Sequence, residues 1–320
     1  MRNRWIVFFL LLLAVIIVAV IDGDYISNRP DRSKPNPFAY DVEEFKNIDP
    51  SLISYREEKN FKIGFDDPAA IAVHGNNIFV AGDMIMKVID LKGILIEAIT
   101  LPLEINALEV IGEKVFMAAG NRILKYDMTG KNFSEWDPLD DNSVITSITA
   151  TENDVFFADA GMRRILRYTH DGEFVLEFDG RSGDEEQYGF IIPSPYFDLD
   201  INEDGELWIV NTGLHAMENF TYDGNFRSQW QNASMQTEGF SGCCNPAHFC
   251  FLPDGRYVTS EKGLVRIKTY RRSGEFEGVV AAPDKFEDEG YAPDVAADTR
   301  SNIYALDFDR KIIRVFTPLS

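Results

Sequence analysis

One recurring unit of short strands constrains the fold of this chain more than any other feature. Residues 155–178 read VFFADAGMRRILRYTHDGEFVLEF, which predicts strands at Val155–Ala158, Arg164–Thr169 and Phe174–Phe178. The segments that join them, DAG and HDG, supply the Asp and Gly residues that tight reversals require. Three short antiparallel strands are not stable alone, because one face of so small a sheet stays uncovered. The unit must therefore pack against copies of itself.

Six copies of the unit occur along the chain. Their first strands begin at Ile78, Val115, Val155, Leu207, Arg256 and Ile303. These positions lie 37 to 52 residues apart, a spacing typical of four-stranded propeller blades. Most copies are preceded by a further strand, which begins at Pro68, Phe197, Pro246 or Pro293. The sequence therefore predicts an all-β protein, a six-bladed β-propeller spanning residues 60–320.

The repeated pattern also resembles a known family. It reads P-x-x-I-A-V-x-x-x-G-x-V-Y-V-A-D followed by R-I-x-x-Y-x-x-D-G-E-F, and it resembles the NHL repeat over roughly residues 60–320. Three shorter motifs, GCCNP at 242–246, LPDG at 252–255 and TSEKG at 259–263, look like a bacterial subgroup of NHL-repeat proteins whose activity is unassigned. The resemblance implies the propeller fold without naming a reaction.

The N-terminus predicts a membrane anchor. Trp5–Ile21 is a run of 17 apolar residues behind Arg2 and Arg4, which is the short end of what crosses a bilayer as a helix. A cleaved signal peptide would need small residues before the cut, and only Ala19 offers one. We therefore expect an uncleaved signal anchor at residues 1–21, with a cleaved signal as the alternative. In either case the propeller is exported to the periplasmic side of the plasma membrane.

Residues 22–59 are polar and interrupted by prolines, so they are predicted to form a tether between anchor and propeller. The last repeat unit contains only three strands of its own before the chain ends. We expect the segment 60–65, NFKIGF, to supply the missing outermost strand. Such a closure would remove an exposed sheet edge.

The charge balance excludes one class of partner. The chain has 52 acidic and 31 basic residues and a formal net charge of -21. Nucleic-acid binding requires clustered Lys and Arg side chains, so we expect no nucleic-acid partner. An acidic surface suits an exported soluble domain, or one whose loops hold calcium.

The resemblance places the usual binding face on one rim of the propeller. Two kinds of loop meet there: those between the second and third strands of a blade, and those between blades. The first kind supplies the candidates Asp159, Arg163, His215, Glu261, Lys262, Asp307 and Arg310. The second kind is long at 180–195, 231–245 and 281–292, and long loops on a rigid scaffold commonly carry recognition. We therefore expect the rim of blades 4–6 to bind a protein or a small ligand.

All three cysteines lie in one segment of that rim, FSGCCNPAHFC at 240–250. In the first interpretation Cys243 and Cys244 form a vicinal disulfide, and Cys250 is a buried thiol. In the second, Cys243, Cys244 and His248 hold a soft metal such as copper or zinc, although their spacing matches no standard zinc pattern. In the third, the cysteine pair only shapes a turn and His248 packs as a strand residue.

Enzymatic alternatives stay open at this stage. Propeller lyases that resemble this fold hold zinc with three His, but two of the four His here, His74 and His170, are predicted on the opposite rim. Lactonase-type propellers bind calcium through Asp, Asn and Glu, for which the candidates are Asp159, Asn211, Glu261 and Asp307. The chain has no G-x-S-x-G, H-E-x-x-H or phosphate-loop motif. A binding module is therefore favoured, and a lyase or lactonase, or a redox or metal protein, is the alternative.

Overall fold

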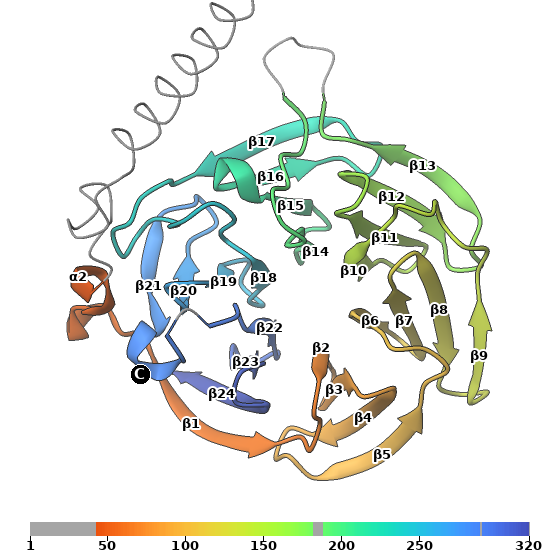
Figure 1. Ribbon diagram of the computed structural model, residues 1–320, viewed down its shortest axis with the longest axis horizontal. Helices are drawn as coiled ribbons and strands as arrows, with labels where there is room; N and C mark the ends of the chain where they lie inside the picture. The colour runs from red at the N-terminus through yellow and green to blue at the C-terminus, as the bar shows by residue number, and fades with distance from the viewer. Residues whose placement is uncertain (1–42, 182–187, 289, 320) are drawn as a thin grey trace, which may run out of the picture. The chain divides into compact units, whose positions relative to one another are not determined.

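The described part of the chain forms a six-bladed β-propeller. The structure is a computed structural model, and it describes residues 43–181, 188–288 and 290–319. These residues form six four-stranded antiparallel sheets arranged around a central axis (Figure 1). The predicted all-β fold and the number of blades are thereby confirmed.

Each blade places its strands in order from the axis outward. Blade 1 contains β2 (Pro68–His74), β3 (Asn77–Gly82), β4 (Ile85–Asp90) and β5 (Leu95–Thr100). Blade 2 contains β6 (Ala107–Ile111), β7 (Lys114–Ala119), β8 (Arg122–Asp127) and β9 (Asn132–Glu135). Blade 3 contains β10 (Ile145–Ala150), β11 (Asp154–Asp159), β12 (Arg164–Thr169) and β13 (Phe174–Phe178).

The second half of the ring repeats this order. Blade 4 contains β14 (Leu199–Ile201), β15 (Leu207–Asn211), β16 (Ala216–Phe220) and β17 (Phe226–Gln231). Blade 5 contains β18 (His248–Phe251), β19 (Tyr257–Glu261), β20 (Arg266–Tyr270) and β21 (Phe276–Ala281). Blade 6 contains β22 (Asp294–Ala297), β23 (Ile303–Asp307) and β24 (Ile312–Pro318).

The ring is closed by a strand from the N-terminal side. Strand β1 (Tyr55–Lys62) pairs antiparallel with β24, from Tyr55 opposite Pro318 to Lys62 opposite Ile312. The predicted mode of closure is therefore correct, but the strand begins at Tyr55 and not at Asn60. Its sequence, YREEKNFK, is polar because an outermost strand exposes every second side chain to solvent.

The chain before β1 also has regular structure where it is described. It forms the short helices α2 (Glu43–Lys46) and η1 (Pro50–Leu52). The N–H of Ser54 then donates to the carbonyl oxygen of Val279 in β21. The predicted anchor at residues 1–21 lies outside the described residues. Among the described residues, none of the helices has the length and hydrophobicity of a membrane-spanning segment.

Burial differs between the middle and the outer strands. Every residue of β15, β19 and β23 is buried, whereas β5 and β17 are mostly exposed. Middle strands are covered by a neighbouring blade on each face, so even their polar side chains lie away from water. They form a rigid scaffold for the loops at their ends.

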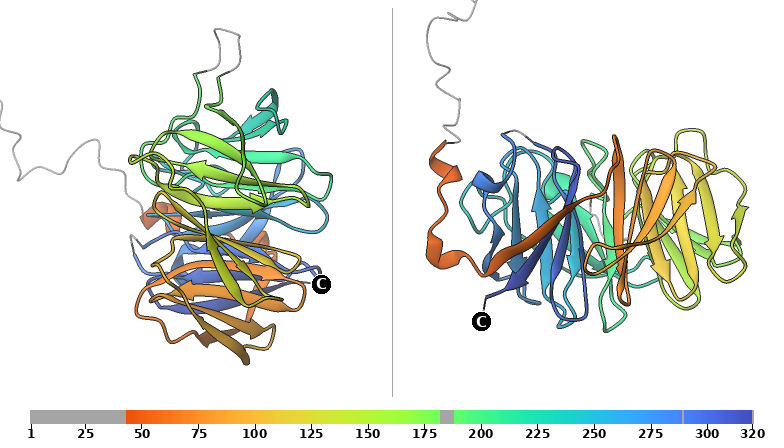
Figure 2. Two further views of the ribbon diagram at one scale, coloured as in Figure 1. Left: turned by 90° about the vertical axis from the view of Figure 1, so that its right-hand side faces the viewer. Right: turned by 90° about the horizontal axis from the view of Figure 1, so that it is seen from below.

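Two kinds of loop share one rim of the propeller, because successive strands are antiparallel. These are the loops between second and third strands and the linkers that enter the next blade; we call their common side the linker rim (Figure 2). His170 lies on the other side, in the turn between β12 and β13, where its ring contacts Lys114 and the carbonyl oxygen of Thr151.

Candidate functional site

A buried ion-pair network supports the linker that carries the cysteine pair. Glu261 ends β19, and its side chain is completely buried. Its Oε1 lies 2.7 Å from Arg266 Nε and 2.8 Å from Lys268 Nζ. The N–H of Ser241 donates to Oε2 over 3.1 Å. Burial alone would raise the pKa of Glu261, but the charges of Lys268 and Arg266 outweigh it and hold the pKa below its usual range.

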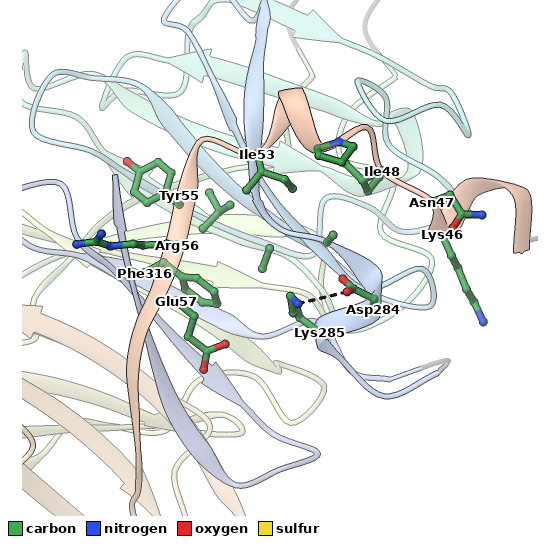
Figure 3. A pocket seen from close by; sticks show the side chains of 14 residues that line it. Lys46, Asn47, Ile48, Ile53, Tyr55, Arg56, Glu57, Asp284, Lys285 and Phe316 are labelled. Atoms are coloured by element: carbon green, nitrogen blue, oxygen red, sulfur yellow. Dashed lines mark ion pairs between the residues drawn. The ribbon is translucent and has the colours of Figure 1, made fainter. Parts of the chain in front are cut away.

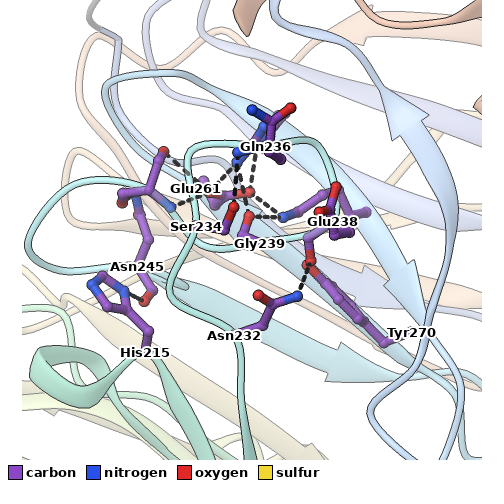
Figure 4. A network of polar contacts seen from close by, with 12 residues as sticks. His215, Asn232, Ser234, Gln236, Glu238, Gly239, Asn245, Glu261 and Tyr270 are labelled. Atoms are coloured by element: carbon purple, nitrogen blue, oxygen red, sulfur yellow. Dashed lines mark hydrogen bonds and ion pairs between the residues drawn. The ribbon is translucent and has the colours of Figure 1, made fainter. Parts of the chain in front are cut away.

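The same cations fix the backbone of the linker between β17 and β18. The carbonyl oxygen of Gly239 accepts from Arg266 Nη2 at 2.8 Å and from Lys268 Nζ at 2.5 Å. The carbonyl oxygen of Glu238 accepts from the Tyr270 hydroxyl at 2.9 Å (Figure 4). Burial lowers the pKa of Lys268 to about 7, against the attraction of Glu261. In this structure Glu261 holds the linker in place and faces no solvent.

Asn245 fixes the end of the linker next to the cysteines. Its side-chain amide donates to Ser241 O at 2.7 Å and accepts from the N–H of Lys262 at 2.9 Å. Its carbonyl oxygen lies 2.8 Å from His215 Nδ1 (Figure 4). His215 has a left-handed backbone, φ 54°, in the turn between β15 and β16. His215 therefore positions the cysteine linker from the neighbouring blade.

Five side chains linked by ring contacts and by electrostatic interactions lie where this linker meets the linker rim, and we call them the rim cluster: Tyr196, Cys243, Cys244, His248 and Lys262. Lys262 Nζ lies 4.8 Å from the centroid of the Tyr196 ring. The rings of Tyr196 and His248 meet edge to face at 5.5 Å. Lys262 Nζ also donates to Ser194 Oγ at 3.3 Å. A cation above an aromatic face gains about 0.5–1 kcal/mol at a partly exposed position, which favours this arrangement.

The cysteine pair consists of two thiols in contact. The Sγ atoms of Cys243 and Cys244 lie 3.2 Å apart. Cys243 is exposed and Cys244 is buried. The hydrogen bond with Cys244 raises the pKa of Cys243, and burial raises it further. The two thiols are free in the structure, and the vicinal disulfide stays a prediction.

His248 lies between two carboxyl groups at the central axis. Its Nδ1 is 3.8 Å from Asp198 Oδ2 and 3.9 Å from Asp294 Oδ1. Each carboxyl also accepts a backbone N–H from the next blade, Phe249 for Asp198 and Ile71 for Asp294. Burial raises the pKa of Asp198 to about 6 and of Asp294 to about 7, and it lowers the pKa of His248. Two carboxyl groups whose pKa values lie near neutral therefore flank an imidazole whose charged form burial disfavours.

Two further acids lie on innermost strands, Asp200 on β14 and Glu109 on β6. Asp200 accepts the N–H of Phe251 at 3.1 Å, and burial raises its pKa to about 6. Burial also raises the pKa of Glu109 on β6 well above its usual range. Sequence reasoning missed these acids and Tyr196. The alternating acids in FDLD of blade 4 were a usable signal, because residues two apart on an innermost strand face the axis together.

The predicted calcium ligands end the second strands of four different blades and are engaged there. Asp159 accepts from the Ser143 hydroxyl, the Val144 N–H and Arg164. Asn211 accepts the N–H of Ile191, and Asp307 pairs with Arg314. Within the described ranges, no three His, Cys, Asp or Glu residues are placed to hold a metal ion. Neither this set nor Cys243, Cys244 and His248 is assembled as a metal site there.

The two remaining candidates lie outside the rim cluster. Arg163 is exposed at the turn between β11 and β12 of blade 3. Arg310 on blade 6 donates to the carbonyl oxygen of Lys285 and pairs with Glu287 at 3.2 Å. The structure therefore brings together the predicted residues of blade 5 and not those of blades 3 and 6.

A cavity of about 640 Å³ lies apart from the rim cluster, between the outermost strands β1 and β21. Figure 3 shows Ile53, Tyr55 and Phe316 lining it, with Lys285 paired to Asp284 at 3.3 Å. Lys46, at another part of its edge, pairs with Asp288 at 2.8 Å. Because Lys46 and Lys285 at this cavity are already paired with acidic side chains, we place the candidate site at the rim cluster.

Comparison with known proteins supports the fold. No protein-family model matches the chain, and no curated protein sequence does. A streptogramin B lyase structure superposes with a TM-score of 0.60 at 14% identity, covering 85% of this chain and 100% of that chain. A protein of unknown function from Bacteroides thetaiotaomicron gives 0.58 at 13% identity, covering 82% and 73%.

A catalytically inactive virginiamycin B lyase from Staphylococcus aureus, solved with quinupristin, gives a TM-score of 0.57 at 16% identity, covering 82% of this chain and 99% of that chain. At such low identities the likeness establishes the fold alone. The NHL resemblance therefore stays a prediction.

Proposed function

We propose that this protein is an exported, membrane-tethered propeller of the NHL type that binds a protein or small ligand through the rim of blades 4–6. The observation that carries the proposal is the rim cluster. Its members come from the linker before β14, from the linker before β18 with the first residue of that strand, and from the turn after β19. Binding surfaces are commonly built in this way, from loops on a rigid scaffold.

The rim cluster is organised before any ligand arrives. Glu261 and Asn245 hold the linker backbone, and Tyr196 and Ser194 hold the Lys262 side chain. Groups that are already ordered lose little conformational freedom on binding, which favours affinity. Lys262 supplies a positive charge on a chain of net charge -21, so the expected ligand presents a carboxylate or carbonyl group to it.

The test compares variants of the rim cluster with a control on the opposite rim. Lys262→Ala and Tyr196→Ala remove the cation and its aromatic support. Lys92→Ala removes an exposed lysine in the turn between β4 and β5. For all three variants we would quantify the proteins captured from a periplasmic extract. We would also measure the shift in melting temperature with a panel of short peptides and carboxylates.

We expect both rim variants to lower the affinity for each ligand found by at least tenfold, or about 1.4 kcal/mol. The control variant should leave the affinity unchanged. Equal binding by all three variants to every retained ligand would refute a role for this rim.

An enzymatic role is the second candidate, and one arrangement favours it. His248 lies between Asp198 and Asp294, whose pKa values burial raises to about 6 and about 7. A histidine beside protonatable carboxyls is suited to general acid–base catalysis. Ring opening of lactones and cyclic depsipeptides, followed by mass spectrometry, tests for lyase or lactonase activity. If the wild type turns over such a substrate and His248→Gln does not, the result would favour this alternative over binding alone.

A further inference from the structure

A second cavity lies on blade 4 and shares no residue with the rim cluster. It measures about 200 Å³, and its lining includes Tyr188, Glu218, Phe226, Gln229 and Gln231. Glu218 comes from β16, whereas Phe226, Gln229 and Gln231 come from the outermost strand, β17. Tyr188 belongs to the linker that enters blade 4. The cavity therefore opens at the outer part of blade 4.

Glu218 is the unusual group in this cavity. The residue is only 6% exposed, and its Oε1 accepts one hydrogen bond, from the Asn211 side chain at 3.1 Å. In the described part of the chain no Lys, Arg or His lies within ion-pair distance of it. Buried carboxyl groups are normally paired with a cation or with several donors, because an isolated buried charge is costly.

The rest of the lining suits a cation. Two residues of the lining, Phe226 and Tyr188, are aromatic, and aromatic rings attract organic ammonium groups through their negative faces. Gln229 and Gln231 bring amide carbonyl oxygens, which can accept from an N–H. A divalent metal ion would need several oxygen ligands with more negative charge than one carboxylate supplies. The volume accommodates a group of a few heavy atoms.

We infer that this cavity is a binding site for a small organic ammonium ion, with Glu218 as its counter-ion and Tyr188 and Phe226 as its aromatic contacts. The site extends beyond the proposed function, because it neither uses nor depends on Lys262 or the cysteine linker. A bound cation would provide the charge partner that the buried carboxyl lacks.

The protonation of Glu218 makes the site dependent on pH. Burial raises the pKa of Glu218 to about 7, and the one opposing contact comes from Asn211, which is neutral. Tyr188 is the other titratable residue in the lining. Because the carboxylate form is needed, affinity for a permanently charged cation must fall as the pH drops below 7.

The experiment titrates the full-length protein with tetramethylammonium chloride and, separately, with neutral tert-butyl alcohol, followed by NMR. At pH 8 we expect saturable binding of the cation and none of the alcohol. At pH 6 we expect about tenfold weaker binding, since the ionised fraction of a group with a pKa near 7 falls by about that factor. Glu218→Gln should abolish both the binding and its pH dependence.

Controls separate this site from general charge effects and from the rim cluster. Glu173→Gln removes an exposed carboxylate on blade 3 and should leave binding unchanged, as should Lys262→Ala. Phe226→Leu keeps an apolar side chain but removes a ring, so it should lower the affinity for tetramethylammonium several-fold. If Glu218→Gln does not fold, the Phe226→Leu variant tests the site in its place. The proposal is overturned if the folded wild type does not bind the cation, if it binds the alcohol equally well, or if binding is the same at pH 6 and pH 8.

Discussion

Blades 4 and 5 are neighbours built on one pattern, yet they handle a buried charge on the third strand in opposite ways. In blade 5, Lys268 lies 2.8 Å from Glu261 at the end of the second strand. In blade 4 the equivalent positions hold Glu218 and the neutral Asn211, 3.1 Å apart. Lys268 faces Thr259 across the sheet and Glu218 faces Ile209, each at the third position of its second strand.

The difference shows how one repeat position serves two purposes. A matched pair in blade 5 holds the cysteine linker and, through it, the rim cluster. In blade 4 no cation of the described residues pairs with Glu218, and its carboxyl lines a cavity. The two arrangements differ at the end of the second strand, Glu261 against Asn211, and on the third strand, Lys268 against Glu218.

The largest expected effect follows from removing the acid in blade 5. Glu261→Gln leaves Arg266 and Lys268 buried without a counter-charge, so the free energy of unfolding should fall by about 3–5 kcal/mol. Urea unfolding followed by circular dichroism measures the loss. A change below 1 kcal/mol would mean that the buried pair is not important for stability.

The second effect concerns the acid in blade 4. The pKa of Glu218 is about 7 in the folded protein, against 4.5 for an ordinary Glu. Because the folded state holds the proton more tightly, protonated Glu218 stabilises the fold. This stabilisation is fully present below pH 4.5 and is lost as the pH rises through 7. The loss should reach about 3 kcal/mol by pH 8. Glu218→Gln should remove this part of the pH dependence. Unfolding curves for the two proteins that stay parallel between pH 5 and pH 8 would contradict the assignment.

A third prediction uses the cysteines to report on the linker that blade 5 holds. In reduced wild-type protein, exposed Cys243 should react with iodoacetamide at least tenfold faster than buried Cys244 and Cys250. In Glu261→Gln, Cys244 should also become reactive, because the linker loses its anchor. Peptide mass spectrometry gives the site of labelling. In protein purified under oxidising conditions, three free thiols would refute the predicted vicinal disulfide.

The smallest effect is expected for an exposed ion pair on blade 5. Arg271 and Glu275 lie 3.4 Å apart and both are largely exposed. Arg271→Ala should change the free energy of unfolding by no more than about 0.5 kcal/mol. Urea unfolding of Arg271→Ala and Glu261→Gln, measured side by side, compares an exposed with a buried ion pair. A large loss for Glu261→Gln alone shows that burial of the pair determines its effect on stability.

Part of the candidate site could be predicted from the sequence. The rim position of Lys262 and the neighbourhood of His215 and the cysteine linker follow from the order of strands within a blade. The role of Glu261 could not be predicted, because its two cations on β20 look like ordinary exposed strand residues in RIKTY. Tyr196 was missed because it lies in a linker without any repeat pattern.

The sequence by itself determined the number of blades, the strands and their turns, because these depend on contacts between residues close together in the chain. The tertiary structure decided which charges are matched. Asp198, His248 and Asp294 come together because blades 4, 5 and 6 pack side by side around the axis, and among the described residues no cation of any blade reaches Glu218. Burial between blades then shifts the pKa of each group, and the identity of a residue alone does not determine that shift.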